Sequence, residues 1–324
     1  MKKLLLGIFI LVSLNSHAAH FEEFSGVSNI KIVYQIFGSH KGSKGSMVIS
    51  PGRTESSIKY QELANIFIAE GYSPIYVINH RGQGFSGRML ADPHKGHVNN
   101  FHHYSKDFNT FVELILKNEN TDKKKLYLLA HSMGGAISMD YLQNYQHPFK
   151  KVILSSPMLG IKLERSELST LLLTKLMCLS KNKCNDYAPG KKPYSEENVI
   201  FENNDLTSDQ NRFYEKIERW REYPELQLGG ATLKWVQESI KANRLMRTGY
   251  RLKKLRGIEL KIFQAQADTV VNNNAQDLLC NRLNSVMKIR QCEIIKYPNA
   301  LHEIYMENDL IRMNAIHYLF NFFK

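Results

Sequence analysis

The sequence predicts an α/β fold: a mostly parallel sheet with helices on both faces and a helical insertion between two of its strands. Three observations predict it. Short apolar runs alternate with amphipathic helical patterns, as in βαβ units. Most of these runs are apolar throughout, which is typical of strands covered on both faces. From Met158 to Tyr250 the alternation stops, and helical patterns follow one another without a convincing strand.

The first expected strand differs from the later ones. Residues 29–37 alternate apolar and polar side chains, which predicts a half-exposed antiparallel strand at an edge of the sheet. Buried strands are expected at the apolar runs 47–49, 74–78, 126–129, 152–154 and 260–263, and a further strand at 292–297. Helices are expected where apolar residues recur along one face, at 57–70, 104–116 and 135–145.

The composition excludes several classes of protein. The chain has 324 residues, of which 43% are hydrophobic, enough for a substantial core. Its Gly and Pro content and a mean hydropathy of −0.35 exclude collagen, low-complexity sequence and a polytopic membrane protein. Lys and Arg number 43 against 31 Asp and Glu, so the formal charge of +12 favours anionic partners. We expect no nucleic-acid partner, because no known nucleic-acid-binding motif accompanies this charge.

The N-terminus has the pattern of a secretory signal peptide. Met1–Lys3 is basic, residues 4–14 are apolar but too few to span a bilayer, and Ser16–Ala18 fits the small-x-small cleavage rule. We expect cleavage after Ala18 and an exported protein, periplasmic or secreted. The alternative is an uncleaved segment held in the inner membrane. The expected organisation is a signal peptide, a first part of the core, a helical cap and a second part of the core, at 1–18, 19–157, 158–250 and 251–324.

The four cysteines permit two disulfides in a chain that we expect to be exported. Of the three connectivities we favour Cys178 with Cys184 and Cys280 with Cys292. The first pair would close a short polar loop, and the second would tie a helix to the strand that follows it. Four free buried thiols are the alternative.

Residues 127–135 predict a buried strand, a turn that carries a serine, and a helix. Such a turn holds Ser132 in a strained backbone conformation, and the close approach of strand and helix requires small residues at Ala130 and Gly134. This is the nucleophile-elbow arrangement. The helix amide at Met133 would then point toward a developing oxyanion. A turn serine without a chemical role is the alternative.

A serine nucleophile needs a base, and the base needs a carboxylate that orients it. Asp268 follows the expected strand at 260–263, and His302 follows the one at 292–297. Both therefore lie at the carboxyl edge of the expected sheet, where ligands bind, and their order along the chain fits the elbow. The nearest competing acid, Asp277, lies inside an expected helix.

The loop after strand 47–49 would supply the second oxyanion donor. Gly52 lets its backbone approach closely, so the Arg53 amide is the candidate. An ordinary Pro-Gly turn is the alternative. No histidine spacing matches a metal-ligand motif, and we expect neither a metal nor a cofactor. Surface or capping roles are expected for the other histidines, including His131, and a packing or hydrogen-bonding role beside the base for Glu303.

In these residues the chain resembles the bacterial lysophospholipases of Gram-negative inner membranes. Those enzymes belong to the monoglyceride-lipase-like and serine-aminopeptidase branch of the α/β-hydrolases. The resemblance runs from about Gly26 to the C-terminus. It implies the α/β-hydrolase fold, with Ser132, Asp268 and His302 as nucleophile, acid and base. Asn79 departs from it, since the family usually has Asp at that strand end. The matching stretches are Pro51–Ser56 with Lys59–Tyr60, His80–Arg88, Ala130–Ala136, Leu228–Thr232 and Trp235–Val236.

The resemblance implies a serine carboxylic ester hydrolase of lysophospholipids, and also of monoacylglycerols, with some capacity to transfer the acyl group to another lipid. The alternatives are a peptidase or small-ester hydrolase of the same branch and a catalytically silent lipid-binding protein. Lysine clusters at 123–125 and 181–192 would attract an anionic membrane, although each can be an ordinary solvated surface. Residues 166–179 are apolar on more than one face and form either the insertion's own core or a contact with lipid.

Overall fold

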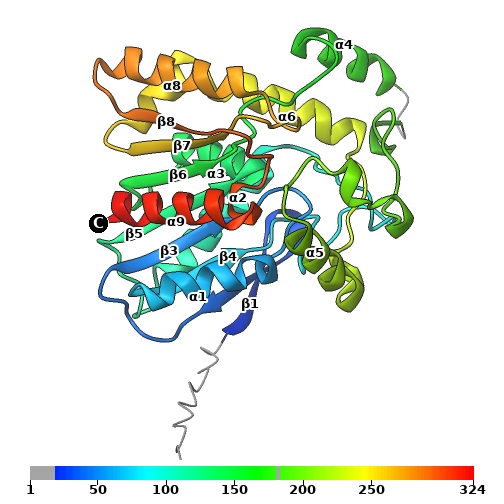
Figure 1. The fold of residues 1–324 in the computed structure, drawn as a ribbon. Coiled ribbons are helices and arrows are strands. Elements are labelled where there is room, and N and C mark those ends of the chain that lie inside the picture. Colours follow the sequence, from blue (N-terminus) through cyan, green and yellow to red (C-terminus); the bar gives the residue numbers. More distant parts are fainter. Residues whose placement is uncertain (1–18, 180–182) are drawn as a thin grey trace, which may run out of the picture.

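One eight-stranded sheet forms the centre of the protein (Figure 1). The computed structural model describes residues 19–179 and 183–324, so the expected signal peptide lies outside the described residues. The strand order is β1-β2-β4-β3-β5-β6-β7-β8. β2 pairs antiparallel with β1 and β4, and all other neighbours pair parallel. The strands are β1 (Ala19–Ser25), β2 (Lys31–Phe37), β3 (Gly45–Ser50), β4 (Tyr72–Ile78), β5 (Leu126–His131), β6 (Lys151–Ser155), β7 (Glu259–Ala265) and β8 (Cys292–Tyr297).

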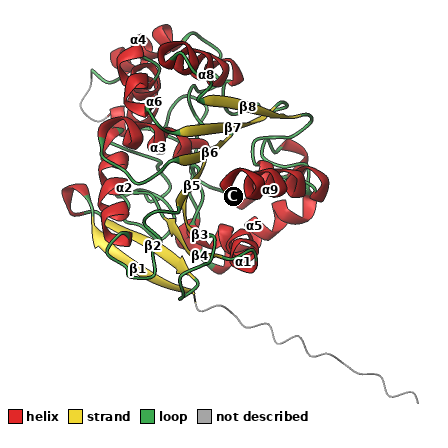
Figure 2. Ribbon diagram, turned by 90° about the vertical axis from the view of Figure 1, so that its left-hand side faces the viewer, coloured by secondary structure: helices red, strands yellow, loops and turns green. Residues whose placement is uncertain are grey.

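Helices cover both faces of this sheet (Figure 2). The side chains of a strand alternate between the two faces, so neighbouring residues of β3 enter different cores. Met47 and Ile49 pack with α1 and α9, whereas Val48 packs in the core with α2, α3 and α8. The expected α/β architecture with a mostly parallel sheet is confirmed. The five helices are α1 (Gln61–Ala69), α2 (His102–Ile115), α3 (Ser132–Asn144), α8 (Asn273–Met287) and α9 (Asp309–Phe323).

β2 is not the edge strand that the sequence predicts. β1 pairs with it along its whole length, from Ala19 opposite Phe37 to Ser25 opposite Lys31. Six of the seven residues of β2 are buried, so the prediction of a half-exposed edge strand is wrong. β1 is exposed at almost every position and therefore has no apolar pattern that could reveal it in the sequence.

The chain between β6 and β7 carries helices and loops in place of sheet strands, and we call residues 158–250 the helical insertion. Figure 1 shows α4 and α5 to the right of the sheet, beyond the carboxyl ends of its parallel strands. In the part of the chain that the structure describes, no helix is both long enough and apolar enough to span a bilayer. The helices of the insertion are α4 (Glu167–Met177), α5 (Gln210–Glu222), α6 (Leu233–Met246) and α7 (Gly249–Leu252).

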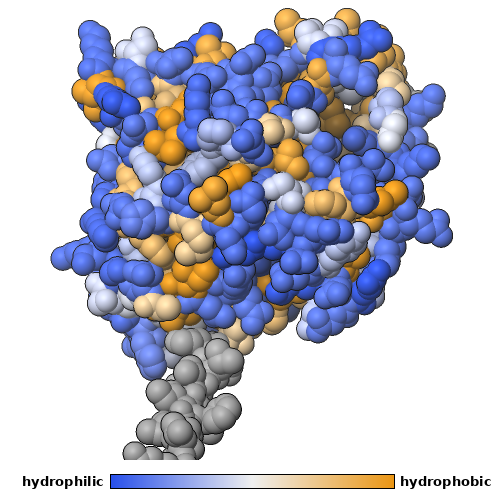
Figure 3. Space-filling model, in the orientation of Figure 1, coloured by the Kyte–Doolittle hydropathy of each residue, from blue (hydrophilic) through white to orange (hydrophobic). Residues whose placement is uncertain are grey.

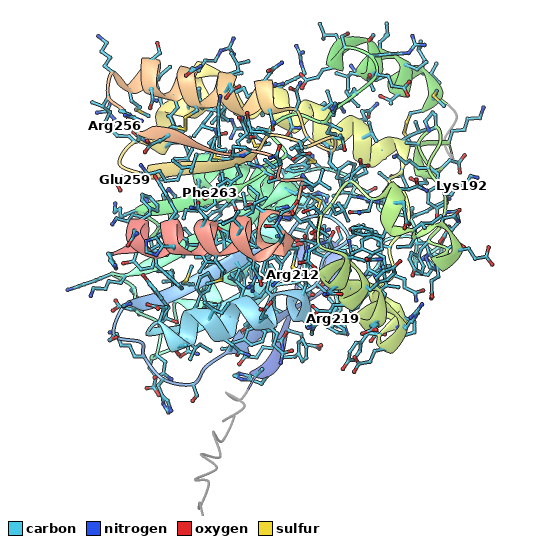
Figure 4. The ribbon with its side chains drawn as sticks, viewed as in Figure 1. Lys192, Arg212, Arg219, Arg256, Glu259 and Phe263 are labelled. Atoms are coloured by element: carbon cyan, nitrogen blue, oxygen red, sulfur yellow. A yellow bond between two sulfur atoms is a disulfide. The ribbon has the colours of Figure 1, made fainter. Side chains whose placement is uncertain are left out.

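Arginine side chains on α5 hold the insertion against the core (Figure 4). Arg212 donates a hydrogen bond to the carbonyl oxygen of Glu307 at 3.2 Å and pairs with Asp309 at 2.7 Å. Arg219 donates to the carbonyl oxygen of Ile58 at 2.9 Å. These bonds join α5 to the segments before α1 and α9.

Both favoured cysteine pairings are present. Cys178, just after α4, is bonded to Cys184 across a short loop of the insertion. Cys280 on α8 is bonded to Cys292, the first residue of β8, so this bridge ties a helix to the following strand as expected.

Candidate active site

A strained turn between β5 and α3 presents Ser132. Its φ of +49° lies in the left-handed region that residues other than glycine rarely adopt. The turn is tight because the loop after β3 presses against the start of α3. A Cβ atom on Gly134 would lie 2.1 Å from the carbonyl oxygen of Ser50. The small residue that the elbow pattern requires at this position therefore follows from a direct backbone contact.

The structure brings Ser132, His302 and Asp268 together in one hydrogen-bonded chain. Ser132 Oγ lies 2.8 Å from His302 Nε2, and His302 Nδ1 lies 2.7 Å from Asp268 Oδ2. The other carboxylate oxygen, Oδ1, accepts hydrogen bonds from the amides of Val270 and Val271 at 2.8 and 3.0 Å. Burial opposes ionisation of Asp268, but the hydrogen bond and charge of His302 and these two amides lower its pKa below its ordinary value. The carboxylate is therefore ionised at neutral pH and holds the imidazole in one tautomer.

Backbone amides of Met133 and Arg53 flank the serine. Met133 is in the first turn of α3, where N–H groups have no partner within the helix. Arg53 follows Gly52, whose backbone lies so close to Ser132 that an added Cβ would be 3.1 Å from the serine Cβ. Within residues 19–179 and 183–324, neither amide donates a hydrogen bond to another protein group. Both can therefore receive a substrate oxygen.

Residues 41–309 match the family model described as serine aminopeptidase, S33 (Hydrolase_4). The chain belongs to this family. It is 32% identical over 303 residues to lysophospholipase L2 of Escherichia coli, a match that covers 93% of this chain and 86% of that protein. A probable lysophospholipase L2 of Haemophilus influenzae is 32% identical over 302 residues, or 91% of each chain.

The fold likewise resembles that of solved lipases. A soluble variant of the Saccharomyces cerevisiae monoglyceride lipase superposes with a TM-score of 0.73, at 18% identity, over 97% of this chain and 96% of that one. These matches confirm the α/β-hydrolase fold and the resemblance to the lysophospholipase and monoglyceride-lipase branch that the sequence indicated.

The loop of this S33-family chain that carries Arg53 is held by two side chains from different motifs. Gln83 donates hydrogen bonds to the carbonyl oxygens of Gly52, at 2.6 Å, and Glu55, at 3.0 Å. The Glu55 carboxylate in turn accepts a hydrogen bond from the Gly52 amide. The stretches 51–56 and 80–88, which are separate in the sequence, thus form one hydrogen-bonded unit beside Ser132.

The same carboxylate reaches the backbone of the histidine loop through His131. Glu55 Oε1 lies 3.0 Å from His131 Nδ1, and His131 Nε2 donates to the carbonyl oxygen of His302 at 3.2 Å. Burial opposes the charged form of each group, but Glu55 raises the pKa of His131, while Lys59 and His131 lower the pKa of Glu55 well below its ordinary value. The expectation of a surface or capping role for His131 is wrong. Its side chain is buried and belongs to an ionic cluster with Glu55.

Glu303 and two lysines complete this cluster. Lys59 pairs with Glu55 at 2.5 Å and with Glu303 at 2.7 Å, and Lys216 on α5 lies 3.7 Å from Glu303. Glu303 therefore has the hydrogen-bonding role beside His302 that the sequence suggested, and it also links the core to the insertion. In the sequence, Glu55 belongs to the family-matching stretch Pro51–Ser56, but that stretch does not identify His131 or Lys59 as its partner.

The helical insertion covers the loop that carries His302. The carbonyl oxygens of Asp205 and Leu206 accept hydrogen bonds from the amides of His302 and Glu303 at 3.3 and 2.8 Å. A groove of about 380 Å³, which we call the insertion groove, opens between this segment and α5. Its lining includes the apolar side chains of Tyr194, Val199, Ile200, Leu206, Phe213, Ile217, Trp220, Leu228 and Val270.

Asn79, the departure from the family pattern, has a structural role. Its Nδ2 donates to the carbonyl oxygen of Val33 at 3.2 Å, and its Oδ1 accepts from the amide of Ser57 at 2.9 Å. An aspartate could accept but not donate here, so the amide suits this position. No group of three or more His, Cys, Asp or Glu side chains in the described residues could hold a metal ion.

Proposed function

We propose that this protein is a serine hydrolase that cleaves the carboxylic ester of lysophospholipids, and also of monoacylglycerols. The observation that carries the proposal is the unbroken hydrogen-bonded chain from Ser132 through His302 to Asp268. In a family whose full-length relatives are named lysophospholipases, this chain of groups supports the role of a catalytic triad.

The catalytic roles follow from the positions of the atoms. Ser132 Oγ attacks the ester carbonyl carbon while His302 Nε2 takes its proton, and Asp268 stabilises the imidazolium that forms. The carbonyl oxygen becomes an oxyanion held by the amides of Arg53 and Met133. His302 then protonates the departing glycerol oxygen, which leaves an acyl-enzyme. Water, activated by the same histidine, attacks that ester and releases the fatty acid.

Comparing three substrates tests the substrate class. We expect purified protein to release fatty acid from lysophosphatidylcholine and from 1-monoacylglycerol and to leave an aminoacyl arylamide almost untouched, with products identified by mass spectrometry. The arylamide is included because the family description names an aminopeptidase. Faster turnover of the arylamide than of either lipid would assign a peptidase in place of a lipid esterase.

We also propose that the insertion caps the site and that α4 contacts the membrane from which the substrate comes. Leucines on α4 are exposed, with Leu172 61% and Leu176 55% accessible, and Lys175 lies between them. Figure 3 shows hydrophobic residues at the upper right of the molecule, over α4. Apolar side chains beside a basic residue suit an anionic lipid surface.

Replacing both Leu172 and Leu176 by Glu is expected to weaken binding to phosphatidylglycerol vesicles at least tenfold, because two side chains can no longer enter the bilayer. Cosedimentation measures the binding. Turnover of a water-soluble short-chain ester should persist, which shows that the variant is folded. The matched control is Ile289→Glu, at an apolar residue 62% exposed in the turn between α8 and β8. Equal vesicle binding by the double variant and the control would contradict the membrane contact.

Export of the mature chain is proposed on the signal-peptide pattern, and the two disulfides support it because such bonds persist in oxidising compartments. The intact mass of the protein recovered from a periplasmic extract should correspond to a chain that begins at Ala19. A mass that includes residues 1–18 would contradict cleavage.

A further inference from the structure

A positive charge beside the candidate oxyanion hole has no negative partner. The guanidinium of Arg53 donates one hydrogen bond, from Nη2 to the carbonyl oxygen of Gly229 at 2.6 Å. Its Nε is buried without a partner, and in the part of the chain that the structure describes no carboxylate lies within 4.0 Å of it. The other buried cations near the site, Lys59 and Lys216, both face Glu303.

The surroundings of this guanidinium do not neutralise it. It lies over the ring of Trp235, with its Cζ 5.5 Å from the ring centroid, and against Gly96, where an added Cβ would be 2.3 Å from Nη2. Burial lowers the pKa of Arg53 to about 10, so the side chain is still protonated at neutral pH. A desolvated cation without a counter-charge is costly, and an anion that binds beside it would recover that cost.

The position of the charge relative to the reacting ester matches one class of lipid. The candidate oxyanion donor is the Arg53 amide, and about six covalent bonds separate that nitrogen from its own Cζ. In a 1-acyl lysophospholipid about six bonds also separate the ester carbonyl carbon from the phosphorus. Because the two covalent paths have the same number of bonds, a lipid whose carbonyl oxygen is held by the Arg53 amide has its phosphate within reach of the Arg53 guanidinium.

We propose that the Arg53 side chain is the phosphate-binding subsite of this enzyme and selects lysophospholipids over neutral monoacylglycerols. The inference rests on the proposed function and refines it, because it names the group of the substrate that the site recognises. Arginine is suited to this task, since its planar fork offers two parallel N–H donors to a phosphodiester. The phosphate takes no part in bond breaking and serves only to bind and orient the ester.

The test compares two substrates with the same acyl chain, 1-acyl lysophosphatidylcholine and 1-monoacylglycerol, in mixed micelles of a neutral detergent. Arg53→Gln keeps the backbone amide and removes the charge. We expect its kcat/KM for the lysophospholipid to fall about 10- to 100-fold more than that for the monoacylglycerol, as for the loss of a hydrogen bond to a charged group. Arg53→Lys, which keeps the charge but not the fork, should give an intermediate change in this ratio.

Arg256→Gln is the matched control. Arg256 is exposed at the opposite end of the sheet from the insertion (Figure 4), so its loss should leave both activities unchanged. Equal losses on the two substrates in Arg53→Gln would mean that the residue only shapes the loop, and would overturn the inference. The inference would also be overturned if the ratio of kcat/KM for the lysophospholipid to kcat/KM for the monoacylglycerol were the same in Arg53→Lys, Arg53→Gln and the wild-type protein. This ratio compares two substrates of one variant, so it can be used even if a variant folds poorly. If the wild-type protein hydrolyses neither lipid, the proposed function itself fails, which is a different result.

Discussion

Ser132→Ala is expected to abolish ester hydrolysis, with a loss in kcat on the order of 10⁶. The reason is that His302 can activate only a hydroxyl within hydrogen-bonding distance, and Ser132 Oγ lies 2.8 Å from its Nε2. Methyl replaces hydroxyl at that point, so neither attack nor acyl-enzyme formation can occur. Fatty-acid release from lysophosphatidylcholine by the purified variant measures the effect.

Ser138→Ala is the control for that experiment. Ser138 is a buried serine of the same helix, and its hydroxyl has no hydrogen-bond partner in the described residues. Removing it costs no interaction, so this variant should keep wild-type turnover and stability. Substantial turnover by Ser132→Ala, with Ser138→Ala normal, would show that another group performs the reaction.

Asp268→Asn is expected to lower kcat by about 10⁴ while leaving the fold intact. The carboxylate accepts a hydrogen bond from the Nδ1–H group of His302 at 2.7 Å, and its lowered pKa keeps it ionised. An amide can present an N–H group to the same ring nitrogen and so favour the tautomer that cannot accept the serine proton. The decrease in kcat has a second cause, because the amide lacks the negative charge with which Asp268 stabilises the imidazolium.

The control for this second change is Asp277→Asn on α8, the nearest competing acid in the sequence. Its carboxylate accepts a hydrogen bond from Gln264 at 3.2 Å and does not contact His302. Steady-state kinetics on the monoacylglycerol should show full activity for Asp277→Asn, and thermal unfolding should show that both variants are folded. A larger loss of activity in Asp277→Asn than in Asp268→Asn would show that the assignment of Asp268 as the acid is wrong.

Much of the fold could be predicted because buried parallel strands are continuous apolar runs. The run at 126–129, for example, becomes β5, and the glycine that follows the serine by two positions packs directly against the backbone of Ser50. β1 could not be predicted, since it is stabilised by main-chain hydrogen bonds to β2 rather than by buried side chains. Main-chain pairing leaves almost no trace in the sequence.

Some residues of the candidate site could be predicted from the sequence and others could not, because only some of them belong to a local sequence pattern. Ser132, Asp268 and His302 each follow a predicted strand, so the common carboxyl edge of the sheet brings them together. The contact between Glu55 and His131 joins the loop after β3 to the last residue of β5, which no local pattern relates, and only the folded backbone places the two side chains 3.0 Å apart. The bond from the His302 amide to Asp205 likewise depends on how the insertion folds back over the core.

Fluorophosphonate labelling with peptide mapping by mass spectrometry tests the central claim most directly, because only a serine activated by a neighbouring base reacts quickly with this reagent. The expected result is one adduct per chain, on Ser132, absent from Ser132→Ala and formed much more slowly in Asp268→Asn. Absence of an adduct on the folded wild-type protein, or an adduct on a different residue, would contradict the account.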